Sequence, residues 1–197
     1  MLEEAGFDCH RVDRNGTPNL FARWGAKGAR AMGFNGHTDV VPPGDPASWT
    51  HPPFSGHWDA DDVIWGRGAT DMKGGLAAVV AAMAALGTAS RHGAELTGPV
   101  QLVVTVDEEE HGAGVRDFVT EANEHRFAGC VVAEPTDLEI VRGCRGASYI
   151  EIEIRGRAAH SGRPADGRSA ITAGAAIVGL IGDDQSRLAQ TVDDLRA

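Results

Sequence analysis

Residues 33–41 read GFNGHTDVV, an apolar segment that ends in His37 and Asp39 and then runs into Pro42-Pro43-Gly44. The apolar part predicts a buried strand, and the Pro/Gly part predicts the loop that follows it. Side chains two residues apart on a strand point to the same side, so His37 and Asp39 face the same way. The pair suits a metal ligand, His37, whose ring tautomer is held by the carboxylate of Asp39. It would equally suit a surface histidine beside a turn aspartate, so the choice depends on the rest of the chain.

The bulk properties exclude several classes of protein. The chain has 197 residues and a formal net charge of -10, which allows one full domain, or one domain and part of another. It has no basic patch, so nucleic acid is not an expected partner. No apolar run approaches the roughly 20 residues that span a bilayer, so no membrane partner is expected. The cysteines are odd in number and far apart, which indicates reduced thiols in a cytoplasmic protein. They are Cys9, Cys130 and Cys144.

Strand-like and helix-like segments alternate along the chain. Strands are predicted at 7–12, 19–24, 31–35, 100–106 and 130–133, and helices at 76–86, 115–124 and 169–181. This alternation predicts an α/β fold with a mostly parallel central sheet flanked by helices. A further strand at 148–154 opens a smaller α+β unit that is too short for a core of its own. We therefore expect one domain over residues 1–144 and a partial second domain over residues 145–197.

Carboxylates and one histidine gather at the ends of these predicted strands, and one more aspartate lies in the turn before a helix. They are His37, Asp39, Asp71, Glu108, Glu109 and Glu134. Ligands of open α/β sheets bind at the carboxyl edge, where strand ends meet. So many carboxylates would repel one another unless cations lay among them. A histidine with carboxylates and no thiolate suits Zn²⁺, and less specifically Co²⁺ or Mn²⁺.

The adjacent Glu108 and Glu109 permit a division of roles, in which one binds metal and the other is the general base for a water molecule. Asp71 is placed to bridge two metal ions about 3.5–4 Å apart. An acidic run alone is usually a solvated rim. The strand-ending H-x-D, the turn before the helix at 76–86 and the strand-ending E-P make a metal centre the better interpretation.

Four motifs resemble those of the M20 family of metallopeptidases. They are GHTDVVP (36–42), WGRGATDMKGG (65–75), DEE (107–109) and AEPT (133–136). The resemblance runs in register from about residue 2 to about residue 181. The branch it resembles contains bacterial succinyl-diaminopimelate desuccinylases and acetylornithine deacetylases. It implies a zinc-exopeptidase-like catalytic domain, followed by a lid or dimerisation domain that pairs two subunits into a homodimer.

The resemblance also implies a role for each residue of the cluster. His37, Asp71 and Glu134 would hold one zinc ion. Asp71 and Glu109 would hold the other, so that Asp71 bridges the two.

The resemblance also implies features that are not metal ligands. Glu108 would be the general base, Asp39 would orient His37, and the peptide bond between Asp71 and Met72 would be cis. His160 would reach from the lid domain into the partner subunit's site and stabilise the oxyanion. The second zinc needs a late histidine that this sequence lacks, and the opening helix is also missing, so we expect the chain to be a fragment.

The implied activity is hydrolysis of the amide bond of an N-acyl amino acid. Residues 2–7 and 44–54 look most like the desuccinylases, and a desuccinylase is the activity that we expect. Residues 159–164 look more like the deacetylases and general aminoacylases. These, or a carboxypeptidase of the same family, are the alternatives. Arg145 and Arg163 are candidates to bind substrate carboxylates, as is Arg168, because an arginine fork matches a carboxylate. The alternative from another class is a non-catalytic metal-binding interaction module, because one ligand is missing.

Overall fold

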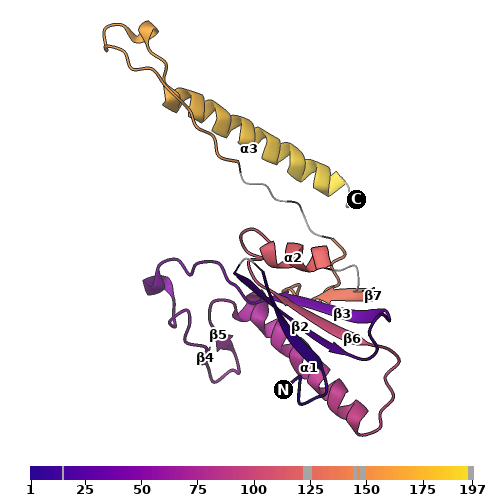
Figure 1. Cartoon of the computed structure of the whole chain (residues 1–197). Helices are drawn as coiled ribbons and strands as arrows, with labels where there is room; N and C mark the ends of the chain where they lie inside the picture. Colours follow the sequence, from indigo (N-terminus) through magenta and orange to yellow (C-terminus); the bar gives the residue numbers. More distant parts are fainter. Residues whose placement is uncertain (15, 122–125, 144–145, 147–149, 195–197) are drawn as a thin grey trace. The chain divides into compact units, whose positions relative to one another are not determined.

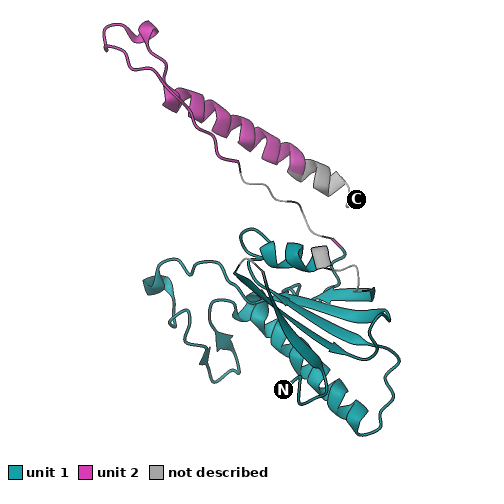
Figure 2. Cartoon of the chain, in the orientation of Figure 1, with its two compact units in different colours: residues 1–142 teal, residues 143–197 magenta. Residues whose placement is uncertain are grey.

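The computed structural model describes the chain except residues 15, 122–125, 144–145, 147–149 and 195–197. The chain divides into two compact units, unit 1 at Met1–Arg142 and unit 2 at Gly143–Ala197 (Figure 2). The division falls beside the expected boundary at 144/145. Arg145, a predicted substrate-binding residue, lies outside the described residues.

A five-stranded sheet forms the centre of unit 1 (Figure 1). In spatial order its strands are β1 (Asp8–Arg14), β2 (Thr17–Trp24), β6 (Val100–Thr105), β3 (Ala31–His37) and β7 (Phe127–Val132). The α/β class is confirmed, but the sheet is mixed and not mostly parallel. β3 pairs in parallel with β6 and β7, whereas β1 with β2 and β2 with β6 are antiparallel. Only residues 15 and 16 separate β1 from β2, and so short a connection permits only antiparallel pairing.

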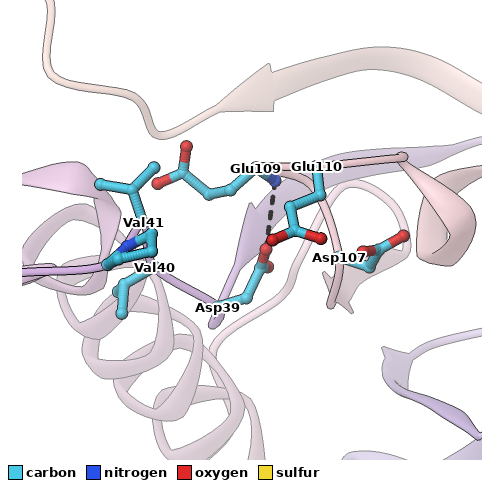
Figure 3. A pocket seen from close by; sticks show the side chains of 7 residues that line it. Asp39, Val40, Val41, Asp107, Glu109 and Glu110 are labelled. Carbon is cyan, nitrogen blue, oxygen red and sulfur yellow. Dashed lines mark hydrogen bonds between the residues drawn. The ribbon is translucent and has the colours of Figure 1, made fainter.

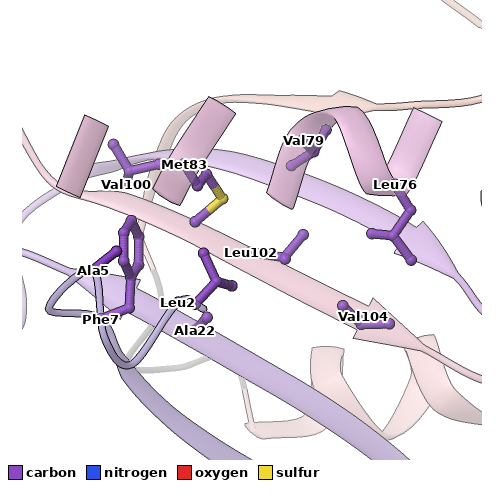
Figure 4. Close-up of a cluster of buried hydrophobic side chains, with 10 residues drawn as sticks. All are labelled: Leu2, Ala5, Phe7, Ala22, Leu76, Val79, Met83, Val100, Leu102 and Val104. Carbon is purple, nitrogen blue, oxygen red and sulfur yellow. The ribbon is translucent and has the colours of Figure 1, made fainter. Parts of the chain in front are cut away.

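Helices α1 (Gly74–Arg91) and α2 (Ala113–Glu121) cover opposite faces of this sheet (Figure 1). The α1 side chains in the core cluster of Figure 4 are Leu76, Val79 and Met83, which pack against the sheet. On the other face, the ring of Phe118 in α2 stacks on Phe21 of β2 with the centroids 5.2 Å apart. Neighbouring residues on a strand face opposite sides of the sheet. The strand β2 therefore contributes side chains to the packing against both α1 and α2.

The helix α1 also gives an apparent membrane signal. With the turn before it, α1 forms a helix (Ala69–Arg91) that is long and apolar enough to cross a bilayer, contrary to our expectation that no such run exists. The core helices of soluble proteins meet the same criteria. The buried side chains of α1 in this core, Leu76, Val79 and Met83, pack against the sheet.

A long connection leaves the end of β3 and returns at α1. It contains a short 3-10 turn (Pro46–Ser48) and a two-stranded hairpin of β4 (His57–Trp58) and β5 (Ile64–Trp65). The carboxylate of Asp59 holds the hairpin together, since it accepts hydrogen bonds from the Trp65 indole at 2.6 Å and from the Val63 amide at 3.0 Å.

Unit 2 consists of an extended segment, a loop and the helix α3 (Ala170–Asp194). The described part of the strand expected at 148–154, residues 150–154, forms no strand. A strand needs a partner to pair with, and in this part of the chain a single bridge between Arg157 and Arg168 is formed instead. The predicted helix at 169–181 is correct in place but extends further.

Candidate metal centre

Three parallel strands end side by side at one edge of the sheet. β3 ends at His37, the acidic run with Glu108 follows β6, and Glu134 follows β7. Because β3 lies between β6 and β7, the histidine is the middle member of this row. Strand order therefore brings together side chains that are far apart in the sequence.

The imidazole of His37 is 2 % exposed and its Nε2 atom faces three carboxylates. The nearest oxygens belong to Asp71 at 3.2 Å, Glu134 at 3.7 Å and Glu108 at 3.8 Å. One ligand atom each from His37, Asp71 and Glu134 lie within 4.8 Å of one another. A nitrogen and two carboxylate oxygens converging on one point fit a divalent cation of the Zn²⁺ type.

The other ring nitrogen of His37, Nδ1, lies close to two oxygens of Asp39. Nδ1 lies 3.0 Å from the main-chain carbonyl oxygen of Asp39 and 3.5 Å from the Oδ1 atom of the same residue. A proton on Nδ1 leaves the lone pair of Nε2 directed at the carboxylates, which is the tautomer that a metal requires. Sequence reasoning assigned this task to the Asp39 side chain, and the closer acceptor is its backbone.

Asp71 reaches the cluster from the segment just before α1. The peptide bond between Asp71 and Met72 is cis, as the resemblance implied. Met72 is buried and its sulfur accepts the main-chain N–H of His37 at 3.2 Å, while the Lys73 ammonium donates to the carbonyl of Thr38 at 2.6 Å. These contacts attach the turn that carries Asp71 to the end of β3, independently of any ion.

Two glycines let these elements approach so closely. A Cβ at Gly36 would lie 3.0 Å from the terminal methyl of Met72. A Cβ at Gly75 in α1 would collide with the carbonyl oxygen of Ala133, the residue before Glu134. The glycines of these motifs therefore set the distance between β3, β7 and α1.

The charges in the cluster act on one another. Burial of the His37 imidazole acts to lower its pKa, but the hydrogen bond to Asp39 and the charges of Glu108, Asp39 and Glu134 outweigh burial and raise the pKa above its usual value. Burial, followed by the charge of Asp71, raises the pKa of Glu134. In both residues, neighbouring carboxylate charges act to raise the pKa, and a divalent cation would neutralise those charges.

Glu109 lies beside the three clustered residues. It lines a cavity of about 320 Å³ with the segment Asp39–Pro42 and with Asp107 and Glu110 (Figure 3). Its backbone N–H donates to Oδ2 of Asp39 at 3.1 Å. Its negative charge contributes to the raised pKa of Glu134, so Glu109 is close enough to share in the electrostatics of the cluster.

A second group of possible ligand atoms belongs to Asp107, Glu110 and His111. All three lie on one turn, and Glu110 and His111 are exposed. The carboxylate of Asp107 accepts the N–H of Ala113, and this bond, followed by the interaction with His111, lowers its pKa. Its evident role is to cap the start of α2.

His160 and Arg163 belong to unit 2. His160 lies in an exposed loop, where the N–H of Gly162 donates to its Nδ1 atom at 3.0 Å. That bond places the ring proton on Nε2, which can then act as a donor. Arg163 is exposed, and its main-chain N–H donates to the carbonyl of His160.

Comparisons with known proteins show what this chain is similar to. The sequence model of Peptidase family M20/M25/M40 matches residues 33–188. A succinyl-diaminopimelate desuccinylase of Paracoccus denitrificans is 52% identical over 182 residues, which cover 88% of this chain and 46% of that protein. One from Cereibacter sphaeroides is 46% identical, covering 90% of this chain and 48% of the relative. The chain thus spans about half the length of the curated relatives it matches.

Solved structures share the fold. An M20 family metallo-carboxypeptidase from Sulfolobus solfataricus aligns with a TM-score of 0.57 at 25% identity, covering 67% of this chain and 30% of that one. A tripeptidase from Staphylococcus aureus aligns with a TM-score of 0.58 at 18% identity, covering 90% of this chain and 48% of that one. The second likeness is one of fold alone.

Proposed function

This chain belongs to Peptidase family M20/M25/M40, and from that premise we propose that it works as a zinc-dependent hydrolase of N-acyl amino acids. The observation that carries the proposal is the convergence of His37, Asp71 and Glu134, whose ligand atoms lie within 4.8 Å of one another at one sheet edge. The relatives named succinyl-diaminopimelate desuccinylase favour an N-succinyl amino acid as the substrate.

His37, Asp71 and Glu134 would hold the first zinc ion, and Asp71 with Glu109 the second, with Co²⁺ or Mn²⁺ as substitutes. When bound, zinc supplies a Lewis acid that acidifies water and polarises the scissile carbonyl. A single Asp71 carboxylate has two oxygens, so it can serve both ions. The nearness of Glu109 to the same cavity supports its place in the second set.

Glu108 is the proposed general base. Its Oε2 atom lies 3.8 Å from Nε2 of His37, so it borders the first ion position from the β6 side. Its carboxylate is half exposed and accessible to water. It would take a proton from the attacking water and deliver it to the leaving amine, as positioned carboxylates do in general acid–base catalysis.

Residues of unit 2 complete the proposal. We assign His160 to the active site of a second copy in a homodimer, where its Nε2–H would donate to the oxyanion. The bond from Gly162 to Nδ1 supports the required tautomer. Arg163 and Arg145 would bind carboxylates of the substrate. The proposed compartment is the cytoplasm, where free cysteines stay reduced.

The test is a comparison of substrates in the whole protein that carries this chain. We expect a higher kcat/KM for N-succinyl-diaminopimelate than for N-acetylornithine. The reverse order would support a deacetylase, and equally poor rates would exclude both assignments.

A matched variant separates catalysis from metal binding. Glu108→Gln keeps the shape of the side chain and removes the base, so turnover should fall by at least about 100-fold, while the zinc content stays unchanged. Loss of zinc in this variant would show that Glu108 is a ligand. Full zinc binding with no hydrolysis by the wild-type protein would indicate a non-catalytic module.

A further inference from the structure

We propose that the carboxylate of Asp39 is a positioning residue for the acidic turn at 107–110, which it holds by accepting the main-chain N–H of Glu109. The inference rests on the proposed function, because that turn carries the proposed general base and a proposed zinc ligand. It gives the Asp39 side chain a task other than orienting the imidazole of His37.

The bond joins two segments that are distant in sequence. Oδ2 of Asp39 lies 3.1 Å from the nitrogen of Glu109, and 70 residues separate the pair (Figure 3). The main-chain bond from Thr38 to the carbonyl of Thr105, at 3.1 Å, is the neighbouring link between the same two segments. The contact from Asp39 thus continues the attachment of β3 to β6 beyond the end of the sheet.

The imidazole of His37 does not depend on this carboxylate. The carbonyl oxygen of residue 39 is the closer acceptor for Nδ1, at 3.0 Å against 3.5 Å for Oδ1. Within the described chain, the buried Oδ1 has no hydrogen-bond partner. A main-chain carbonyl is present whatever side chain follows it, so the ring tautomer should survive substitution of Asp39.

The acidic turn, in contrast, needs an attachment to β3. Among the described residues, its other hydrogen bonds run within the turn or toward α2, since Asp107 accepts the N–H groups of Gly112 and Ala113. These bonds fix the turn to the helix that follows it. The Oε2 atom of Glu108 adds a looser ionic contact to Nε2 of His37 at 3.8 Å. The bond from the Glu109 N–H to Oδ2 of Asp39 fixes the turn to the strand that carries His37.

Two substitutions in the 197-residue chain separate the two roles. Asp39→Asn removes the charge but keeps an oxygen that can accept the Glu109 N–H, whereas Asp39→Ala removes both. We expect zinc affinity, measured by competition with a chelator, to fall roughly 10- to 100-fold in the alanine variant and by less than about threefold in the asparagine variant. Amide exchange of Glu109, measured by NMR on the metal-free chain, should accelerate in the alanine variant only.

Asp45 provides a matched control outside the site. Its carboxylate accepts the main-chain N–H of Ala47 at 2.9 Å in the same manner. Asp45→Ala should accelerate exchange of the Ala47 amide and Asp45→Asn should not, with zinc affinity unchanged in both. The two Asp45 variants show how well an asparagine oxygen replaces an aspartate oxygen as the acceptor of a main-chain N–H.

Three results would overturn the inference. Equal losses of zinc affinity in both Asp39 variants would show that the negative charge matters and the acceptor does not. Unchanged zinc affinity in the alanine variant, or unchanged Glu109 exchange, would show that the bond does not hold the turn. If the wild-type chain binds no zinc, the proposed function fails, while the exchange of Glu109 still decides whether Asp39 restrains the turn.

Discussion

Nε2 of His37 lies 3.2 Å from Oδ1 of Asp71, although 34 residues separate them and no secondary-structure element contains both. One stands at the end of β3 and the other in the turn before α1. Their approach depends on the packing of α1 against the sheet and on the contacts of Met72 and Lys73 with the end of β3. The donor atoms of the first ion position are therefore brought together by the fold itself.

Replacing His37 with alanine should abolish tight zinc binding. It removes a proposed ligand atom, so we expect zinc affinity to fall by more than the 10- to 100-fold that loss of an outer partner typically costs. His111→Ala is the control, because His111 belongs to the separate group with Asp107 and Glu110. Chelator competition measures both. A larger loss in the control would place the ion at the acidic turn and not at His37.

Gly75→Ala should damage the fold and the site together. The added methyl would collide with Ala133 and push α1 away from β7. We expect a loss of about 1–3 kcal/mol in the free energy of unfolding measured in urea, typical of overpacking, and weaker zinc binding because Glu134 follows Ala133. Gly179→Ala in α3 is the control, since no atom lies within 4 Å of its added methyl. A neutral Gly75→Ala would show that helix and strand can separate freely.

Met83→Ala should leave a cavity between α1 and the sheet. Met83 is 0% exposed in the core cluster, and large-to-small changes at such positions cost roughly 2–5 kcal/mol. Leu86→Ala in the same helix should cost clearly less, because Leu86 is 38% exposed. Urea unfolding of the two variants measures the difference. Equal losses would contradict the orientation of α1 on the sheet.

The β4–β5 hairpin should loosen in acid. The bond from the Trp65 indole, followed by those from the Val63 and Asp61 amides, lowers the pKa of Asp59 below its reference value of 3.8. A group whose pKa is lower in the folded state stabilises above its unfolded pKa and loses that effect as the pH falls through the folded pKa. The indole resonance of Trp65 should therefore shift as the solution becomes acidic, and Asp59→Asn should remove the transition.

Much of the fold follows from local pattern. The apolar run of β6 and the alanine-rich α1 appear where the sequence predicts them, because buried strands and core helices have strong signatures. Ordered motifs at two strand ends and in the turn before α1 also predict that His37, Asp71 and Glu134 are neighbours, as the structure shows. The antiparallel arrangement of β2 beside β6 could not be predicted in this way, since pairing depends on non-local contacts that no single segment encodes.

Other features depend on atomic detail. The sequence shows that Asp39 stands two residues after His37. Which Asp39 oxygen is the partner of the His37 ring depends on distances from Nδ1 of 3.0 Å to the carbonyl and 3.5 Å to the carboxylate, which the sequence does not give. The alternation at 148–154 predicts a strand, and residues 150–154 form none because alternation does not supply a pairing partner. Resemblance in motifs supplied the roles of Glu108 and Glu109, which adjacency alone leaves open.

The connection that carries the β4–β5 hairpin begins beside His37 and ends beside Asp71. Contacts within the sheet and α1 hold both ends, and doubling the length of such a loop costs only about 0.6 kcal/mol in closure entropy. This segment can therefore differ in length and sequence while the side chains of His37 and Asp71 stay in place. Within unit 1, this segment joins His37 to Asp71 along the chain, yet their approach does not depend on its length.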